Sequence, residues 1–199
     1  MTGIEIGIGA GMFRHSHGAS NHLPKLADFT AWSKDGTPVL TEGPGGINIS
    51  VTGGSSNQHG LYWTGLAGGA TWSKVVAKIK LEADTLAGLV IRSTHDASNT
   101  GYVLAVFDAG SGVRHAGVWR WFDADWYSWE FDNRVITKSA DDTYYLKVEK
   151  SAGNFILSVS LDGITWIDLN TQDQLALVLG IGPVVQNPRS MTLIDWIIS

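Results

Sequence analysis

The chain has 199 residues, 44% of them hydrophobic and 17% charged, which suits one globular domain with a full core and excludes the polar bias of a disordered chain. It contains no cysteine, which excludes disulfides and thiolate metal sites. The net charge of -5 comes without a basic stripe, and no apolar run approaches the ~18 residues of a membrane span, so we expect neither a nucleic-acid partner nor membrane insertion.

The first residues differ from the rest, and we predict that residues 1–29 form an extended N-terminal arm for docking or assembly. A short alternation of isoleucines ends in glycine, histidine and serine, and such a segment buries little surface on its own. The arm lacks the basic and apolar regions of a secretory signal. His15, His17 and His22 form only a weak metal-binding pattern, and solvated side chains are the favoured interpretation.

Residues 30–199 carry strand signals, and we predict that they form one sandwich domain. Within Lys74–Leu81, lysines alternate with apolar residues, which predicts a strand with one buried face and one wet face. Turn residues such as Asp35-Gly36 separate the apolar segments. This pattern predicts an all-β antiparallel sandwich, with helix limited to about one turn within Thr171–Leu177.

The clearest local signal is a hairpin within Asn154–Leu169. Strict alternation predicts a strand with one face in the core and the other in water. The predicted core face holds Phe155, Leu157, Val159 and Leu161. The predicted water face holds Ile156, Ser158 and Ser160. Asp162-Gly163 then predicts a tight turn, because glycine accepts the positive φ that such a turn requires.

The element S-x-D-G-x-x-W-x-x-L, from Ser160 to Leu169, resembles the hairpin of concanavalin A-like jelly-roll sandwiches, the laminin-G and glucanase-like group. Segments 87–107, 143–163 and 179–199 resemble other strand pairs of that group. The resemblance implies an antiparallel jelly-roll β-sandwich with Trp166 and Trp196 in its core. Such short apolar motifs indicate a fold and carry almost no information on function.

The segment Val118–Asn133 holds four of the nine tryptophans. If Val118 and Phe122 face the core, alternation puts Trp119 and Trp121 on the outer face of their sheet, together with a histidine. Aromatic planes on such a face can stack on sugar rings while polar neighbours bind the hydroxyls. The candidate carbohydrate-binding residues are therefore Trp119, Trp121, His115, Arg92, Asp123 and Trp126. The favoured alternative is that the tryptophans serve packing or partner contact.

The resemblance also allows a test for catalysis. Retaining glucanases with this fold carry E-x-D-x-x-E on one strand, which places two carboxyl groups about 5 Å apart. The nearest match is Glu130-x-Asp132, and Arg134 or Val135 stands where the acid is needed. We therefore expect no enzyme activity and no catalytic residues.

Rim loops of such sandwiches often bind Ca²⁺ through carboxylate, amide and backbone oxygens. Asp96 with Asn99, or Asp108 with Ser111, would supply those ligands. Turn residues that bond their own backbone are the favoured interpretation, so we expect no required cofactor.

Three functional hypotheses follow. The opening from Ile4 to Arg14, followed by Leu23-Pro24, resembles that of small phage structural proteins, although Phe13 replaces the usual proline. This favours a virion structural, decoration or tail-associated protein, located in the virion. Its arm would contact other virion proteins or itself, and its sandwich would contact glycan or partner proteins. The alternative is a free-standing lectin-like module, extracellular or cytoplasmic. A glycoside hydrolase is the third hypothesis.

Overall fold

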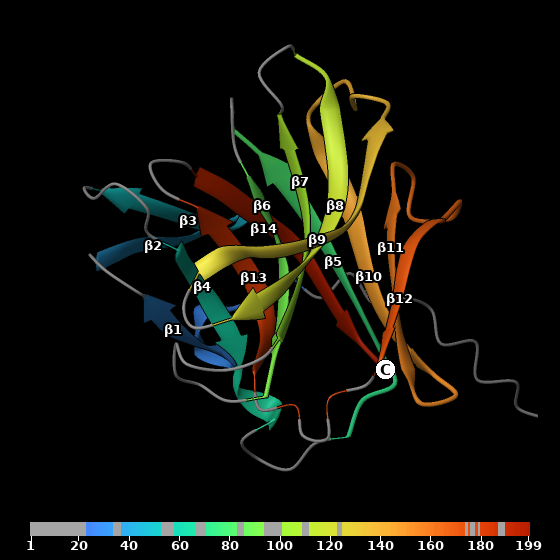
Figure 1. Cartoon of the computed structure of the whole chain (residues 1–199). Coiled ribbons are helices and arrows are strands. Elements are labelled where there is room, and N and C mark those ends of the chain that lie inside the picture. The colour runs from blue at the N-terminus through green and yellow to red at the C-terminus, as the bar shows by residue number, and fades with distance from the viewer. Residues whose placement is uncertain are drawn as a thin grey trace, which may run out of the picture.

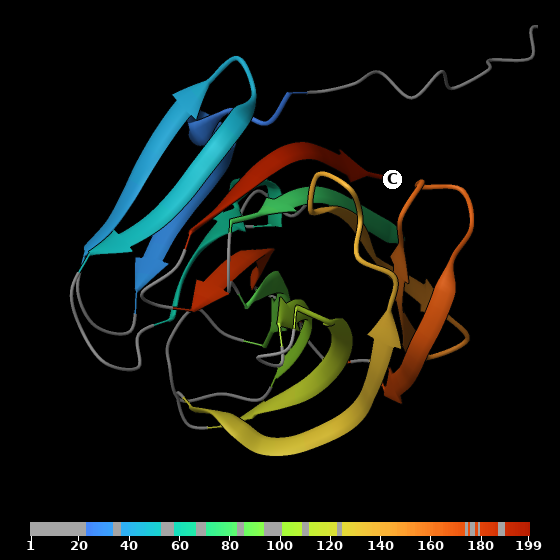
Figure 2. The same ribbon diagram turned by 90° about the horizontal axis from the view of Figure 1, so that it is seen from above.

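The computed structural model describes residues 23–33, 37–52, 58–66, 71–82, 86–93, 101–108, 112–122, 125–173, 175, 178, 180–186 and 190–199. For residues 33, 37, 51, 52, 58, 121, 122 and 125–132 it describes the backbone alone. The described residues form two seven-stranded sheets that pack face to face (Figures 1 and 2).

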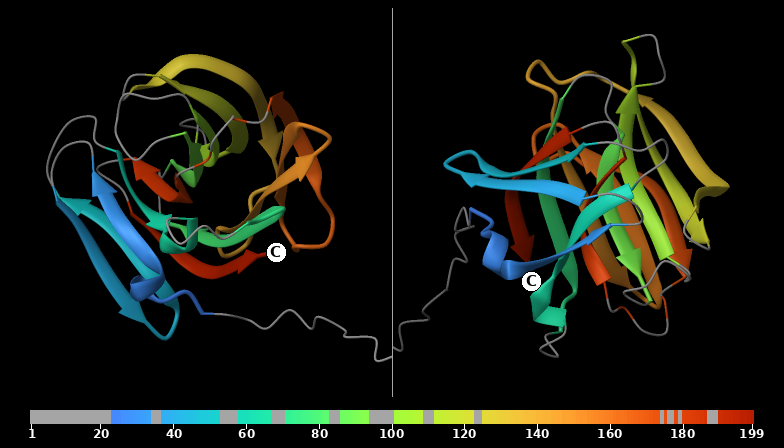
Figure 3. Two further views of the ribbon diagram at one scale, coloured as in Figure 1. Left: turned by 90° about the horizontal axis from the view of Figure 1, so that it is seen from below. Right: turned by 90° about the vertical axis from the view of Figure 1, so that its left-hand side faces the viewer.

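Sheet A joins strands from both ends of the chain. Its order is β1 (Phe29–Ser33), β4 (Gln58–Trp63), β13 (Gly180–Gln186), β6 (Ala87–Arg92), β7 (Gly101–Asp108), β8 (Arg114–Phe122) and β9 (Asp125–Ile136). Sheet B has the order β12 (Ile167–Asp173), β11 (Asn154–Ser160), β10 (Thr143–Ser151), β5 (Lys74–Leu81), β14 (Ser190–Ile198), β3 (Gly46–Thr52) and β2 (Thr37–Gly43). The β2–β3 hairpin lies beside β1 at one edge, and β10 to β12 form the opposite edge (Figure 3).

Every neighbouring strand pair in both sheets is antiparallel, which confirms the predicted all-β antiparallel sandwich. In the described residues, helix is limited to two 3₁₀ turns, η1 (Leu26–Asp28) and η2 (Thr64–Leu66). The helical turn predicted within Thr171–Leu177 is wrong for Thr171–Asp173, which extend β12 and pair with β11. Cross-strand hydrogen bonds outweigh the weak local helix propensity there.

The main core lies between the sheets and follows the predicted alternation. On β5, Val75, Ala77, Ile79 and Leu81 are buried, and Lys78 and Lys80 face outward. The first three of these apolar side chains have no exposed surface. Burial of a full aliphatic side chain stabilises a fold by about 1.5–3 kcal/mol, so these strands anchor the sandwich.

The hairpin of β11 and β12 is confirmed, but its connection is longer than predicted. β11 ends at Ser160 and β12 begins at Ile167, so six residues separate the strands. Asp162 organises this loop: its Oδ1 accepts the N–H groups of Ile164 at 2.8 Å and Thr165 at 2.7 Å. These bonds from Thr165 and Ile164, with the Ser160 hydroxyl, hold the pKa of Asp162 well below its usual range. Gly163 has the positive φ, 74°, that the sequence predicts.

Three predictions within this hairpin are wrong. Leu161 lies in the loop beyond the strand and is 41% exposed. Ser158 and Ser160 are buried, whereas the sequence predicts a solvent-exposed face for them. Their hydroxyls donate to carboxylates, Ser158 to Asp168 at 2.7 Å and Ser160 to Asp162 at 2.9 Å, and a satisfied hydroxyl tolerates burial.

The two tryptophans assigned to the core differ in outcome. Trp196 is in the main core, 8% exposed, with its ring edge-to-face on Phe29 at 5.4 Å, as predicted. Trp166 is half-buried and belongs to the loop before β12, so its assignment to the core is wrong. The Lys147 ammonium lies 4.8 Å from the centre of the Trp166 ring. A cation–π contact of this kind covers the ring without placing it between the sheets.

A charged cluster closes one end of the main core. Arg114 is 1% exposed, and its Nε lies 3.0 Å from Asp142 Oδ1. Its Nη1 lies 3.5 Å from Asp108 Oδ2, and the Tyr144 hydroxyl donates to Asp142 at 3.2 Å. Two carboxylates thus neutralise a guanidinium that would otherwise be costly to bury.

Part of the predicted arm packs on the sandwich. Within Leu23–Phe29, Pro24 and Phe29 are buried, and Leu26 packs against the main core. The Leu26 N–H donates to Glu42 Oε2 at 2.7 Å, which fastens η1 to β2. The His15, His17 and His22 pattern and the Asp35-Gly36 turn lie outside the described residues.

Candidate functional site

The outer face of sheet A, turned away from sheet B, carries a second cluster of buried side chains. Leu89, Leu104 and Val185 point into the main core, so the residues next to them along each strand point to the outer face of sheet A. The outer-face cluster consists of Tyr62, Val90, Val103, Ala105 and Val184, with Trp32, Leu86 and Trp119 packed against it. This face therefore has an apolar centre bordered by aromatic rings.

At one end of the outer face, two aromatic rings and a guanidinium form a stack. Trp32 lies parallel to Tyr62, with ring centres 5.2 Å apart and 12° between the planes. Arg92 Nη1 donates to the Tyr62 hydroxyl at 2.9 Å, and its guanidinium carbon lies 5.6 Å from the Trp32 ring centre. Gly60 lies beneath Trp32 and Gly180 beneath Tyr62, where a β-carbon would come within 2.9 Å and 2.8 Å of the rings.

At the other end, three rings form a row across β7 and β8, which we call the aromatic row. Phe107 lies between His115, with ring centres 5.4 Å apart, and Trp119, at 5.3 Å. Phe107 and His115 are opposite each other in the antiparallel register. The His115 Nδ1 lies 2.8 Å from Oδ1 of Asn133 on β9. The row therefore combines apolar ring faces with an imidazole and an amide.

The hydrogen bond to Asn133 determines what His115 presents to a ligand. An amide oxygen only accepts, so Nδ1 carries the proton, and in a neutral imidazole Nε2 is then an acceptor. The Asn133 side-chain nitrogen keeps its two donors, and this residue is exposed. A sugar hydroxyl donates and accepts, so it can use both groups.

The predicted site residues divide into three groups. Trp119 and His115 are half-buried and lie together on the outer face, while Val118 is in the core, as predicted. Arg92 shares this face, but it is 1% exposed and belongs to the stack at the other end. Trp121 pairs with Gly101 in the backbone register, and Trp126 is on β9. The side chains of Trp121 and Trp126, and all of Asp123, lie outside the described residues.

Sequence reasoning missed Phe107, Asn133, Trp32 and Tyr62. Phe107 had a usable signal, because it follows Val103 and Ala105 in the outward alternation of its strand. Asn133 reaches His115 through a pairing of β8 and β9 that contains register shifts. Trp32 and Tyr62 meet across β1 and β4, and local sequence carries no signal for such a pair.

The structure places only some of the residues in the catalytic and calcium hypotheses. The side chains of Glu130 and Asp132, the nearest match to the glucanase motif, lie outside the described residues. Arg134 Nη2 donates to the Leu169 carbonyl at 3.2 Å, so Arg134 joins β9 to β12. Asp108 accepts the Gly112 N–H at 3.3 Å and pairs with Arg114. Within the described ranges, no three histidine or acidic side chains gather as a metal site would require. The calcium candidates Asp96, Asn99 and Ser111 lie outside those ranges.

Comparisons of the fold identify its class. No protein-family model matches the sequence, and no curated protein is significantly similar to it. A protein of unknown function from Saccharomyces cerevisiae superposes with a TM-score of 0.60 and 14% identity, over 88% of this chain and 98% of that one. The carbohydrate-binding module CBM66 from Bacillus subtilis has a TM-score of 0.51 and 14% identity, over 83% and 92%.

A further neighbour is the exoplasmic/lumenal domain of VIP36, in a form bound to Ca²⁺ and Man3GlcNAc. It has a TM-score of 0.58 and 11% identity, over 87% of this chain and 83% of that one. The chain therefore has the concanavalin A-like jelly-roll fold, as the resemblance implied, shared with lectin-like carbohydrate-binding domains. At these identities the comparisons establish the fold alone. Within the described part of the chain, no helix has the length and hydropathy needed to cross a membrane.

Proposed function

We propose that this protein is a non-catalytic carbohydrate-binding module that holds its glycan on the aromatic row of sheet A. The observation that carries the proposal is the packing of His115, Phe107 and Trp119 in one row, with the exposed Asn133 amide beside it. Two of the reported neighbours, CBM66 and VIP36, are described as carbohydrate-binding or glycan-bound, which supports the same class. The descriptions of CBM66, VIP36 and the yeast protein name no virion component.

The row suits a sugar for two physical reasons. The C–H face of a pyranose or furanose ring is apolar, so it stacks on an indole or phenyl plane and releases water from both surfaces. Its hydroxyls then need partners, and His115 Nε2 accepts while the Asn133 amide donates. The polar groups determine orientation, and the rings provide most of the contact area.

Replacing Trp119 with alanine tests the proposal directly. We expect glycan affinity to fall about 30-fold or more, because loss of a central aromatic anchor costs a binding site about 2 kcal/mol or more. Glycan-array screening identifies the ligand, and calorimetry on the best glycan measures the change. Trp166→Ala is the matched control: it removes a half-buried tryptophan from the loop beside sheet B and should leave affinity unchanged.

Equal affinity in wild type and Trp119→Ala, with the same thermal midpoint, would exclude the aromatic row as the site. Failure of the wild type to bind any arrayed glycan would contradict the carbohydrate proposal itself.

A second substitution, His115→Phe, separates stacking from hydrogen bonding. Phenylalanine keeps the packing on Phe107 and removes both ring nitrogens. We expect affinity to fall about tenfold, the usual effect of one lost hydrogen bond to a ligand. An unchanged affinity would show that His115 serves packing alone.

Three earlier expectations remain predictions. Assembly through residues 1–29, with other virion proteins or with itself, concerns a segment of which the structure describes only residues 23–29. The virion location and the expectation that no Ca²⁺ is required likewise await measurement. Glycan binding measured with and without a chelator decides the calcium question.

A further inference from the structure

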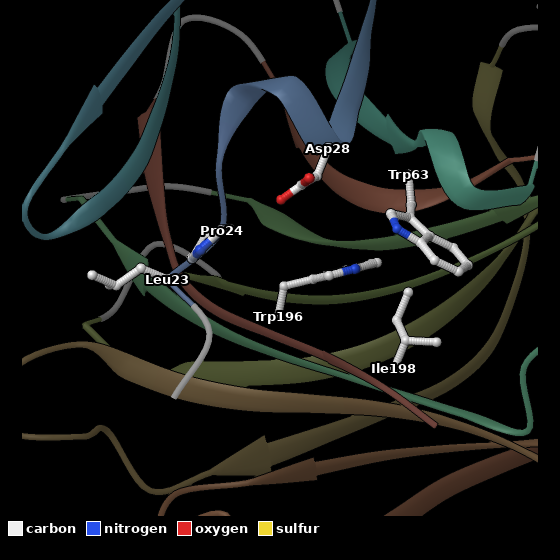
Figure 4. Close-up of a pocket in the computed structure, with 6 residues that line it drawn as sticks. All are labelled: Leu23, Pro24, Asp28, Trp63, Trp196 and Ile198. Atoms are coloured by element: carbon white, nitrogen blue, oxygen red, sulfur yellow. The ribbon is translucent and has the colours of Figure 1, made fainter. Parts of the chain in front are cut away.

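A pocket lies between the two sheets, away from the outer face of sheet A. Its volume is about 250 Å³, and it is lined by Leu23, Pro24, Asp28, Trp63, Trp196 and Ile198. Trp63 comes from sheet A, Trp196 and Ile198 come from sheet B, and the segment before β1 closes the top (Figure 4). We call it the inter-sheet pocket.

The walls of the inter-sheet pocket are fixed by contacts that do not involve a ligand. The Thr64 hydroxyl donates to the Asp28 carbonyl at 3.0 Å, which joins η1 to η2. Trp63 lies flat over Gly65, where a β-carbon would come within 2.1 Å of the indole. Trp196 is braced edge-to-face by Phe29. A preformed pocket loses little conformational entropy when a ligand binds.

One polar group in this pocket is unsatisfied. The Nε1 of Trp196 is buried, and no hydrogen-bond acceptor for it exists among the described residues. A buried N–H without an acceptor costs free energy, and buried indole nitrogens usually have a partner. Figure 4 shows the Trp196 indole beneath the Asp28 carboxylate, with Trp63 beside it. The Trp196 nitrogen has almost no accessible surface, so an occupant seated between these groups supplies the missing acceptor once a small shift of the Trp196 ring brings the N–H to the pocket surface.

The pocket chemistry restricts the class of occupant. Among the described groups, the Asp28 carboxylate accepts one hydrogen bond, from the Lys25 N–H at 3.4 Å. The carboxylate can therefore accept further hydrogen bonds. Its negative charge would repel an anion. An alkylammonium ion would suit the carboxylate and the indole faces but would bring no acceptor for Trp196. A hydroxyl both donates and accepts, and a ring with C–H faces stacks on the indoles.

From these observations we infer that the inter-sheet pocket is a second binding site, for one small neutral hydroxylated ring such as a single sugar residue. The ring lies against Trp63 and Trp196, one hydroxyl donates to Asp28, and an oxygen accepts from Trp196 Nε1. Its volume lies below the ~300–1,000 Å³ typical of small-molecule sites, so one ring fits and an oligosaccharide does not. The inference does not depend on the proposed glycan site at the aromatic row.

The indole N–H signals in a ¹⁵N-correlated NMR spectrum test this inference on the full chain. The Trp196 signal is assigned by its disappearance in Trp196→Phe, and the probes are methyl hexopyranosides, tetramethylammonium and acetate. We expect at least one glycoside to shift the Trp196 signal in a saturable way, with neither ion doing so. Asp28→Asn should weaken that glycoside about tenfold or more, through loss of a charge-assisted hydrogen bond.

Two controls locate the effect. Asp173→Asn removes an exposed carboxylate on β12 and should leave the titration unchanged. Trp119→Ala should also leave it unchanged, even if it abolishes binding at the aromatic row. The inference is overturned by a Trp196 signal that no glycoside moves, by saturation with tetramethylammonium, or by equal affinity in Asp28→Asn.

Discussion

Replacing Phe155 with alanine is expected to lower the free energy of unfolding by about 3–5 kcal/mol, the usual cost of deleting a buried phenylalanine ring. Phe155 is fully buried on β11. It stacks on Trp72, with ring centres 5.9 Å apart, and meets Tyr102 edge-on at 6.3 Å. Its removal leaves a cavity whose walls come from both sheets, and such walls cannot easily collapse.

Urea unfolding monitored by tryptophan fluorescence measures the change. Phe155→Leu keeps much of the volume and should cost less than half as much. A loss below about 1 kcal/mol for the alanine variant would show that the two sheets readjust around the missing ring.

The second large effect is expected at Asp142, which neutralises the buried Arg114. Asp142 has a positive φ of 53°, so Asp142→Asn is the cleanest change, because asparagine tolerates that conformation and keeps the shape. We expect stability to fall by about 3 kcal/mol, since removing one partner leaves a buried guanidinium with less compensation. Asp141→Asn, at an exposed neighbour, should cost under about 1 kcal/mol and serves as the control.

The same pair predicts a pH dependence. Burial alone would raise the pKa of Asp142, but its hydrogen bond and charge interaction with Arg114, together with Lys138, lower it below the usual range. A carboxyl group with a lowered folded-state pKa stabilises the protein fully above its unfolded pKa, about 4, and loses that contribution as the pH falls further.

Stability of the wild type should therefore decrease below about pH 4, and the decrease should be smaller in Asp142→Asn. The depressed pKa of Asp162 adds to the same acid decrease and persists in the variant. Equal acid slopes in both proteins would assign the decrease to Asp162 and other carboxylates.

Much of the fold was predictable because side-chain alternation has a direct physical cause. On β5, the residues with apolar side chains on the predicted core face are buried, and on β11 Phe155, Leu157 and Val159 are buried as predicted, although Ser158 on the opposite face is buried too. Antiparallel pairing follows from short connections between such strands. The resemblance implied a jelly-roll sandwich, but neither it nor periodicity predicted the order of the strands in each sheet, which the structure establishes.

The errors in the β11–β12 hairpin share one origin. The Asp162-Gly163 pair predicts a tight turn, whereas the Asp162 carboxylate accepts two backbone N–H groups and stabilises a six-residue loop. That longer loop leaves Leu161 and Trp166 outside the core. Side-chain hydrogen bonds to nearby backbone compete with tight turns, and alternation does not reveal which will prevail.

The candidate site was only partly predictable. Trp119 and His115 belong to one strand, so periodicity places them on one face. Their neighbours Phe107 and Asn133 come from adjacent strands, and the stack of Trp32, Tyr62 and Arg92 joins three strands far apart in sequence. Contacts of this kind depend on sheet order, which a single sequence does not encode locally.

The glycines beneath Trp32 and Tyr62 also limit which substitutions this face of sheet A can accept. A β-carbon at Gly60 would come within 2.3 Å of the Pro183 carbonyl oxygen and 2.9 Å of the Trp32 ring, and one at Gly180 would come within 2.8 Å of the Tyr62 ring. Libraries that randomise these two positions should therefore return glycine almost exclusively. If the proposed glycan site is correct, variation that alters ligand preference must then accumulate at the β7–β9 end of the same face, around Phe107 and His115. One end of the surface is thereby held constant while the other is free to diversify.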